Sequence, residues 1–167
     1  MEMTKEILLT QGKVALVDDG DFELANQYKW YAFRHTIKGK TTGWYAARTI
    51  RNIPHETQFL HQLIMQPPKG MIVDHKDGNG LNCTSDNMRL CSHLQNMANK
   101  KLASNNKSGY KGVSWSKDSQ KWFVGIGHGS TFHFVGRFDD LEEAAHAYDK
   151  AARDAFGEFA RTNFQDG

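Results

Sequence analysis

The sequence predicts an α+β protein with small antiparallel sheets and a few helices. Three observations lead to this class. The first sixty residues hold several strand-like runs, residues 71–99 follow the order strand, polar loop, strand and helix, and residues 110–157 hold three strand-like runs before one long helix. A chain of 167 residues with 39% hydrophobic and 24% charged residues has room for one domain or two small ones.

The sequence shows no sign of a membrane or secreted protein. No apolar run approaches the ~20 residues that span a bilayer, and the first residues lack the apolar centre of a signal peptide. The two cysteines form no disulfide framework, which agrees with a reducing compartment. We therefore expect a cytoplasmic protein without membrane contact.

The N-terminal part predicts a small antiparallel sheet. Two hairpins are expected from pairs of apolar runs, the first around Gly12 and the second around a polar turn of Lys, Gly and Thr. An Asp/Gly turn between the hairpins leads into a short helix. The expected elements are strands at 7–9, 14–17, 30–35 and 44–50 and a helix at 22–28.

Residues 59–99 are expected to form one compact segment of helices and strands. Leu60, Leu63 and Ile64 have helical spacing, and two prolines at 67 and 68 end that helix. His61 lies within it, and we expect a packed or hydrogen-bonded role for it. Strands at 71–73 and 88–90 then flank a Gly/Asn/Asp loop.

Polar side chains with complementary chemistry surround this loop. Neighbouring residues of a strand point to opposite faces, so Asp74 and His75 can serve two functions from one segment. A helix begins after Ser92, with an apolar stripe of Leu94, Met97 and Ala98, and Asn96 lies on another face of it. A carboxylate and an amide oxygen suit Mg²⁺ or Mn²⁺, and a neutral His beside such a metal can take a proton from water. This pattern predicts metal-assisted phosphodiester hydrolysis.

A zinc site is an alternative interpretation of the same stretch. It would use Cys83, Cys91, His93 and His75. Structural zinc sites favour closely spaced cysteine pairs, and these two cysteines have seven residues between them. Structural zinc is therefore the less favoured hypothesis.

The pattern DH…N…N resembles the HNH nuclease family, with eleven residues between His75 and Asn87 and eight between Asn87 and Asn96. The resemblance implies that His75 activates the water, Asn87 braces the loop, and Asp74 and Asn96 hold one divalent metal, Mg²⁺ or Mn²⁺. It departs from many members at Asn96, where they have His. Metal preference is the property that this departure affects.

The composition changes after Asn99. Residues 100–108 are basic, polar and turn-rich, as in a linker. The lysines there can follow a phosphate backbone, and a solvated linker without DNA contact is the alternative. We expect domains at 1–99 and 109–167, joined by this linker.

Residues 109–167 predict a three-stranded antiparallel sheet with one packed helix. Strands are expected at 110–116, 121–126 and 131–138. The helix begins after Asp140, with Glu143 three residues later, and ends at Gly157. This part resembles the Apetala-type, or ethylene-response-factor, DNA-binding domain through the segments YKGV, KW, VGRF, EEAA, AYD and NF. Ser114, Ser116 and Gly127 stand where that resemblance implies basic residues.

Together these features predict a metal-dependent DNA endonuclease that hydrolyses phosphodiester bonds, similar to homing endonucleases of phages and mobile introns. Such a protein acts on double-stranded DNA as a monomer that nicks one strand. The alternative is a DNA-binding regulator with an inactive nuclease unit. The residues expected to contact DNA are Arg89, Lys100, Lys101, Lys107, Lys111, Trp115, Lys117, Lys121, Trp122 and Arg137.

Overall fold

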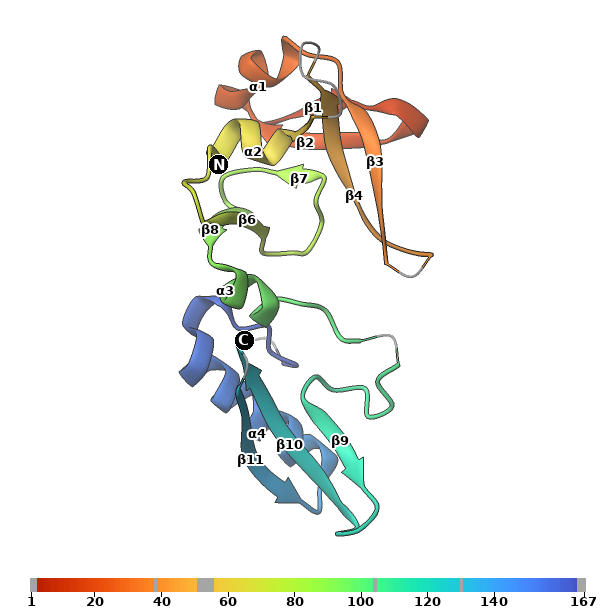
Figure 1. Cartoon of the computed structure of the whole chain (residues 1–167), viewed down its shortest axis with the longest axis vertical. Helices are drawn as coiled ribbons and strands as arrows, with labels where there is room; N and C mark the ends of the chain where they lie inside the picture. Colours follow the sequence, from red (N-terminus) through yellow and green to blue (C-terminus); the bar gives the residue numbers. More distant parts are fainter. Residues whose placement is uncertain (1–2, 38, 51–55, 104, 130, 165–167) are drawn as a thin grey trace. The chain divides into compact units, whose positions relative to one another are not determined.

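A computed structural model describes residues 3–37, 39–50, 56–103, 105–129 and 131–164. The chain divides into two compact units, Met1–Ser92 and His93–Gly167, which are described separately. Each unit has its own hydrophobic core. The elements are short helices and small, mainly antiparallel sheets, which confirms the predicted α+β class (Figure 1).

The first hairpin of the first unit forms as predicted. Strand β1 (Thr4–Leu8) and strand β2 (Val14–Asp18) pair antiparallel across the short 3-10 turn Thr10–Gly12. Helix α1 (Asp19–Asn26) follows directly. A third strand, β7 (Asn82–Cys83), joins the outer side of β2 in parallel, so a distant loop completes this sheet.

The second sheet of the first unit contains one strand that the sequence did not predict. Strand β3 (Tyr31–Ile37) and strand β4 (Lys40–Thr49) form the expected hairpin, and β5 (Thr57–Phe59) adds to the free edge of β4. Helix α2 (Leu60–Met65) begins directly after β5. It ends at Gln66, which has a left-handed backbone (φ 42°), just before the two prolines.

The core of the first unit lies between these sheets and helices. It is built from small and medium apolar side chains around Leu60 and Val17, which are fully buried. The indole of Trp30 donates to the carbonyl of Ala25 at 2.9 Å, so its polar atom is satisfied inside the core. Strand β6 (Ile72–His75) and strand β8 (Met88–Cys91) pair antiparallel and extend this core through Val73 and Met88.

The second unit is a three-stranded sheet with one long helix on one face. Strands β9 (Val113–Ser116), β10 (Lys121–His128) and β11 (Thr131–Phe138) are antiparallel, in the order β11-β10-β9. Helix α4 (Leu141–Phe156) packs its alanines and Tyr148 against the sheet. The Asp140 carboxylate accepts from the amide of Glu143 at 2.8 Å, which confirms the predicted N-cap. Gly157 ends the helix and opens the 3-10 turn Gly157–Phe159.

Helix α3 (His93–Ala98) belongs to the second unit, although it was predicted as the last part of the nuclease domain. The Lys111 ammonium donates to the carbonyl of Ala98, and Arg161 Nη1 donates to the carbonyl of Asn99 at 3.4 Å. These bonds satisfy carbonyl groups at the C-terminal end of the helix. The expected apolar stripe is buried only at Ala98, because Leu94 and Met97 are exposed.

Candidate active site

The site begins with the pairing of β6 and β8. The register places Asp74 opposite Arg89 and His75 opposite Met88. Asp74 and His75 are both buried, with 5% and 6% of their surface exposed, and they point to opposite faces of the strand. The predicted strand pair therefore delivers both polar side chains into the interior of the first unit.

Asn87 fixes the loop that joins the two strands. Its side-chain oxygen accepts from the amide of Asp77 at 3.0 Å, and its Nδ2 donates to Asp77 Oδ1 at 3.1 Å and to the carbonyl of Asn82 at 2.7 Å. Burial tends to raise the pKa of Asp77, but hydrogen bonds from Asn82, Asn79 and Asn87 outweigh it and lower that pKa. Asn87 thus ties Asp77 and Asn82 of the loop together through three side-chain hydrogen bonds.

Arg89 differs from its expected position. It was predicted to contact DNA, but its Nε and Nη2 donate to Asp74 Oδ2 at 3.0 and 2.9 Å. Only 12% of the Arg89 side chain is exposed. An unpaired carboxylate in this interior would be costly, and the cross-strand arginine is the partner that compensates for its burial.

His75 lies among rings and a thiol. The rings of His61 and Tyr45 are 5.1 and 6.0 Å away between centroids, and the sulfur of Cys83 is 4.0 Å from His75 Nε2. Burial lowers the pKa of His75, and the charges of Asp77 and Asp74 only partly oppose that shift. The imidazole is therefore neutral near pH 7, which is the form that accepts a proton.

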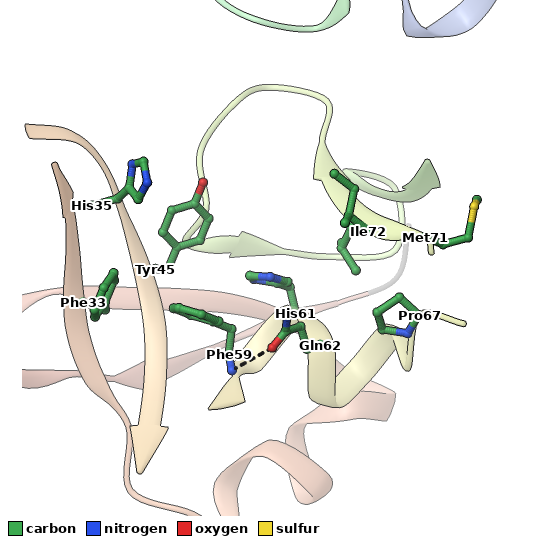
Figure 2. A pocket seen from close by; sticks show the side chains of 10 residues that line it. Phe33, His35, Tyr45, Phe59, His61, Gln62, Pro67, Met71 and Ile72 are labelled. Atoms are coloured by element: carbon green, nitrogen blue, oxygen red, sulfur yellow. Dashed lines mark hydrogen bonds between the residues drawn. The ribbon is translucent and has the colours of Figure 1, made fainter. Parts of the chain in front are cut away.

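Tyr45 and His61 form a second layer around His75, and sequence analysis missed Tyr45. Both line a hollow of about 280 Å³, shown in Figure 2 with Phe33, His35 and Phe59. The hydroxyl of Tyr45 stands near Asp74, and burial and then the Asp74 charge raise the pKa of Tyr45. The sequence signal is weak, because Tyr45 is one of several aromatic residues in a strand.

His61 is a packed residue, as predicted. Its ring stacks on Phe59 at 5.5 Å and meets the His75 ring edge-on. Burial, and then the neighbouring His75, lower the pKa of His61 to about 3. In the described part of the chain, its Nδ1 is buried without a hydrogen-bond partner.

Gly80 allows the loop to lie against this aromatic layer. A Cβ at Gly80 would lie 2.4 Å from the Tyr45 ring and 2.6 Å from the carbonyl oxygen of Trp44. The loop and β4 therefore touch at a point where only glycine fits without a shift. This contact couples the position of Tyr45 to the loop that carries His75.

Comparisons with known proteins agree with this geometry. Residues 66–98, which hold the strand pair, the loop and α3, match the HNH endonuclease family model. An uncharacterized HNH endonuclease of Acanthamoeba polyphaga mimivirus is 32% identical over 155 residues, which cover 92% of this chain and 76% of that protein. The chain belongs to the HNH endonuclease family. Protein 3.8 of Escherichia phage T7 is 42% identical over 95 residues, which cover 56% of this chain and 77% of that protein.

HNH nucleases generally depend on a divalent metal, and the donors of this site fit a hard cation. The Asp74 carboxylate and the predicted ligand Asn96 both offer oxygen, as Mg²⁺ and Mn²⁺ prefer. Asn96 lies on α3 in the second unit, and its role as a ligand stays a prediction. Within the described ranges, no three His, Cys, Asp or Glu side chains form a group that could hold a metal.

The expected DNA contacts of the second unit occupy different environments. Lys111 is largely enclosed and bonded to Ala98, and burial followed by the Arg161 charge lowers its pKa to about 8. Lys111 was expected to face DNA, but its ammonium donates to the carbonyl at the end of α3. Lys121 pairs with Asp139 at 2.9 Å. The exposed basic residues among the predicted contacts are Lys100, Lys101, Lys107, Lys117 and Arg137.

The two tryptophans predicted to contact DNA lie opposite each other on β9 and β10. The rings of Trp115 and Trp122 meet at 4.9 Å between centroids. Trp122 packs against the core of the second unit, whereas Trp115 is 45% exposed. Trp115 is thus the one of the pair that a ligand can reach.

Among the described residues, no helix has both the length and the apolar character needed to cross a membrane.

Proposed function

We propose that this HNH-family chain is a metal-dependent DNA endonuclease that hydrolyses phosphodiester bonds and nicks one strand at a specific site. The observation that supports it most directly is a buried, neutral His75 beside Asp74, at the end of a strand whose loop Asn87 fixes. Hydrolysis needs a base of fixed position near the attacked phosphate. The matching family model and the name of the mimivirus relative support a nuclease, and homing-type nicking is our extension.

Each residue of the site then has one role. His75 takes a proton from the attacking water. Because its Nε2 faces the Cys83 sulfur, we assign Nδ1 as the atom that accepts this proton. Asp74, oriented by Arg89, and Asn96 would hold the cation. A divalent cation there supplies positive charge that stabilises the negative charge developing on phosphate. Asn87 holds the loop so that the imidazole keeps its direction.

Incubation of the full chain with supercoiled plasmid tests this proposal. With Mg²⁺ or Mn²⁺ we expect open circles to accumulate before linear DNA, and EDTA should stop the reaction. His75→Ala should lower the nicking rate by about 10²- to 10⁴-fold, the range for loss of a general base, and leave DNA binding unchanged. His146→Ala, an exposed histidine on α4, is the matched control.

Three results would contradict the proposal. A His75→Ala variant that nicks as fast as the parent would remove the assignment of the base. DNA binding without nicking under any metal would favour the regulator interpretation instead. Nicking that EDTA leaves unchanged would exclude the metal-dependent mechanism.

We further propose that the second unit binds DNA, in the manner of the Apetala-type domain that it resembles. Charge supports this. Residues 93–138, which hold the sheet, have seven Lys and Arg against one Asp, whereas residues 139–167, which hold α4, have three against eight acidic residues. The polyanion should therefore approach the sheet side and the linker.

A salt titration tests the contribution of the lysines. We expect that Lys101→Ala, Lys107→Ala and Lys117→Ala each lower the slope of log affinity against log salt by about 0.9. Each should weaken cognate and unrelated DNA alike, because a phosphate contact carries no sequence information. Lys150→Ala, an exposed lysine on α4, should leave the slope unchanged. A slope that no sheet-side lysine alters would contradict DNA binding by this surface.

A further inference from the structure

One face of the sheet in the second unit is covered by α4, and the opposite face is open and aromatic. Val124 and Ile126 point to the helix and belong to the core. Phe123 lies between Ser114 and Arg137 across the strands, on the other face. A register shift after Val124 brings Phe132 and Phe134 of β11 to the same face as Phe123, as their ring contacts show.

The three phenylalanines form one continuous surface. The rings of Phe123 and Phe132 are nearly parallel, at 9°, with centroids 6.0 Å apart, and Phe134 meets Phe123 at 5.1 Å. Phe132 is 64% exposed and Phe134 is 53% exposed. A Cβ at Gly125 would lie 2.1 Å from the tip of the Phe132 ring, so the ring can come this close to β10 only because glycine is there.

Positive charge and a hollow adjoin the rings. The guanidinium of Arg137 lies 5.2 Å from the centre of the Phe134 ring. A hollow of about 260 Å³ lies beside Phe123 and Phe132, and Ser114 and Asn106 also line it. Its volume is several times the ~30 Å³ that one water molecule takes up in the liquid. A ligand with a flat, partly polar group next to an anionic group would fit the rings, the hollow and the Arg137 guanidinium.

We propose that this face binds the unpaired bases of single-stranded DNA by stacking on Phe123, Phe132 and Phe134. Aromatic side chains bind the flat faces of bases, and a basic surface follows the phosphates. In a duplex those faces are covered by neighbouring base pairs, and reading the groove edges requires hydrogen-bonding side chains. On this face β9 offers only the short polar side chains Ser114 and Ser116, and the Arg137 guanidinium lies over the Phe134 ring. Stacking on the three rings is therefore the main interaction that the face offers.

This inference rests on the proposal that the second unit binds DNA, and it names the form of DNA that the sheet holds. The nuclease unit acts on a duplex in the proposed function. The combination fits a substrate in which an unpaired strand adjoins a duplex. The charge asymmetry described above argues for a polyanion at this face over a second copy of the chain.

Fluorescence anisotropy with the full chain tests the inference. The chain carries His75→Ala so that the probes stay intact, and the probes are a labelled 20-nucleotide single strand of mixed sequence, its duplex, and a single strand with abasic sites. We expect the single strand to bind at least as tightly as the duplex. Phe132→Leu and Phe134→Leu should each weaken single-strand binding by about 5- to 150-fold, the range for one lost base stack, and leave duplex binding within about twofold.

Two comparisons separate stacking from charge and from misfolding. The abasic strand keeps the phosphates but lacks base faces, so the parent should bind it as weakly as the phenylalanine variants bind the normal strand. His133→Leu is the matched control, because His133 lies between the two phenylalanines and pairs with Ile126 on the other face. It should alter neither affinity.

Other outcomes overturn specific parts. Duplex binding without single-strand binding, or phenylalanine variants that weaken only the duplex through thymine methyl contacts, would refute stacking and leave DNA binding by the unit intact. A folded chain that binds no DNA would refute the proposed DNA binding itself. Sedimentation showing a dimer that Phe134→Leu dissociates, with single-strand affinity unchanged, would make this face a self-association surface.

Discussion

The two units of this HNH-family protein distribute polar and aromatic side chains in opposite ways. In the described part of the chain, the first unit buries Asp18, His61, Asp74, His75, Thr84 and Asn87, whereas the second buries Asn99 and Asp149. The exposed aromatic side chains, Trp115, Phe132 and Phe134, all lie in the second unit. Buried polar side chains are thus concentrated in the first unit, and exposed aromatic side chains lie in the second.

The difference follows from what each task requires. A general base needs a fixed direction and a pKa set by its surroundings, and buried hydrogen-bonded neighbours supply both. A surface that binds a long polymer needs accessible rings and charges, and it gains little from burial. In the proposed function, this contrast assigns the reaction to the first unit and DNA binding to the second.

The largest expected effect is a loss of stability of the second unit alone. Gly112 has φ +74°, and a Cβ there would lie 1.9 Å from the ring of Tyr148, which is buried. Gly112→Ala should therefore destabilise this unit by about 3 kcal/mol or more. Hydrogen exchange should show loss of protection in 93–167. Gly127→Ala, in the same sheet with no atom within 4 Å of the new Cβ, is the control.

The same variant tests whether the two units unfold independently. Cys83 and Cys91 are both fully buried in the first unit, and burial followed by the Asp77 charge raises the pKa of Cys83 to about 12. These thiols should stay unreactive to a disulfide reagent at pH 8 in Gly112→Ala. Rapid labelling of both cysteines would show that the first unit depends on the second.

A smaller effect is expected from Asn87→Ala, which acts on the first unit. The change removes three hydrogen bonds in a partly buried loop, so the unit should lose about 1–3 kcal/mol of stability. Plasmid nicking should fall while DNA affinity stays near that of the parent. Asn79→Ala removes one local bond, to the amide of Leu81, and should cost clearly less. Equal effects of the two variants would contradict the bracing role.

The smallest expected effect is a pH dependence in the second unit. The pKa of Lys111 is about 8 in the folded chain, below the usual 10.5, because of burial and then the Arg161 charge. Between those values the unfolded chain binds more protons, so stability from this group rises with pH across that window and is unaffected below it. The stability of the parent relative to Lys111→Met should therefore increase from pH 7 to 9.5 in urea titrations. A constant difference would contradict the shift.

Local signals in the sequence predicted most of the elements. Helix α4 has its cap at Asp140 and its stop at Gly157, and both are short-range signals that the structure confirms. The hairpins β1–β2 and β3–β4 likewise need only nearby residues. The spacing of Asp74, His75 and Asn87 identified the loop that the structure builds around Asn87.

Long-range features could not be predicted in this way. Strands β5 and β7 have three and two residues, too few for a periodic pattern, and each forms only because a partner strand is already present. The role of Arg89 depends on a register that places it opposite Asp74. Tyr45 reaches His75 through the fold, and no spacing in the sequence links the two residues.

The parallel pairing of β7 with β2 determines the smallest segment of this protein that can be transferred into another protein. Leu16 donates to the carbonyl of Leu81 at 2.8 Å, and the amide of Ser85 donates to the Asp18 carboxylate at 2.7 Å. The loop around His75 is therefore hydrogen-bonded to the N-terminal hairpin. A transplanted segment of 66–98 would leave behind the strand that completes it, so the unit of recombination and of engineering is the whole of Met1–Ser92.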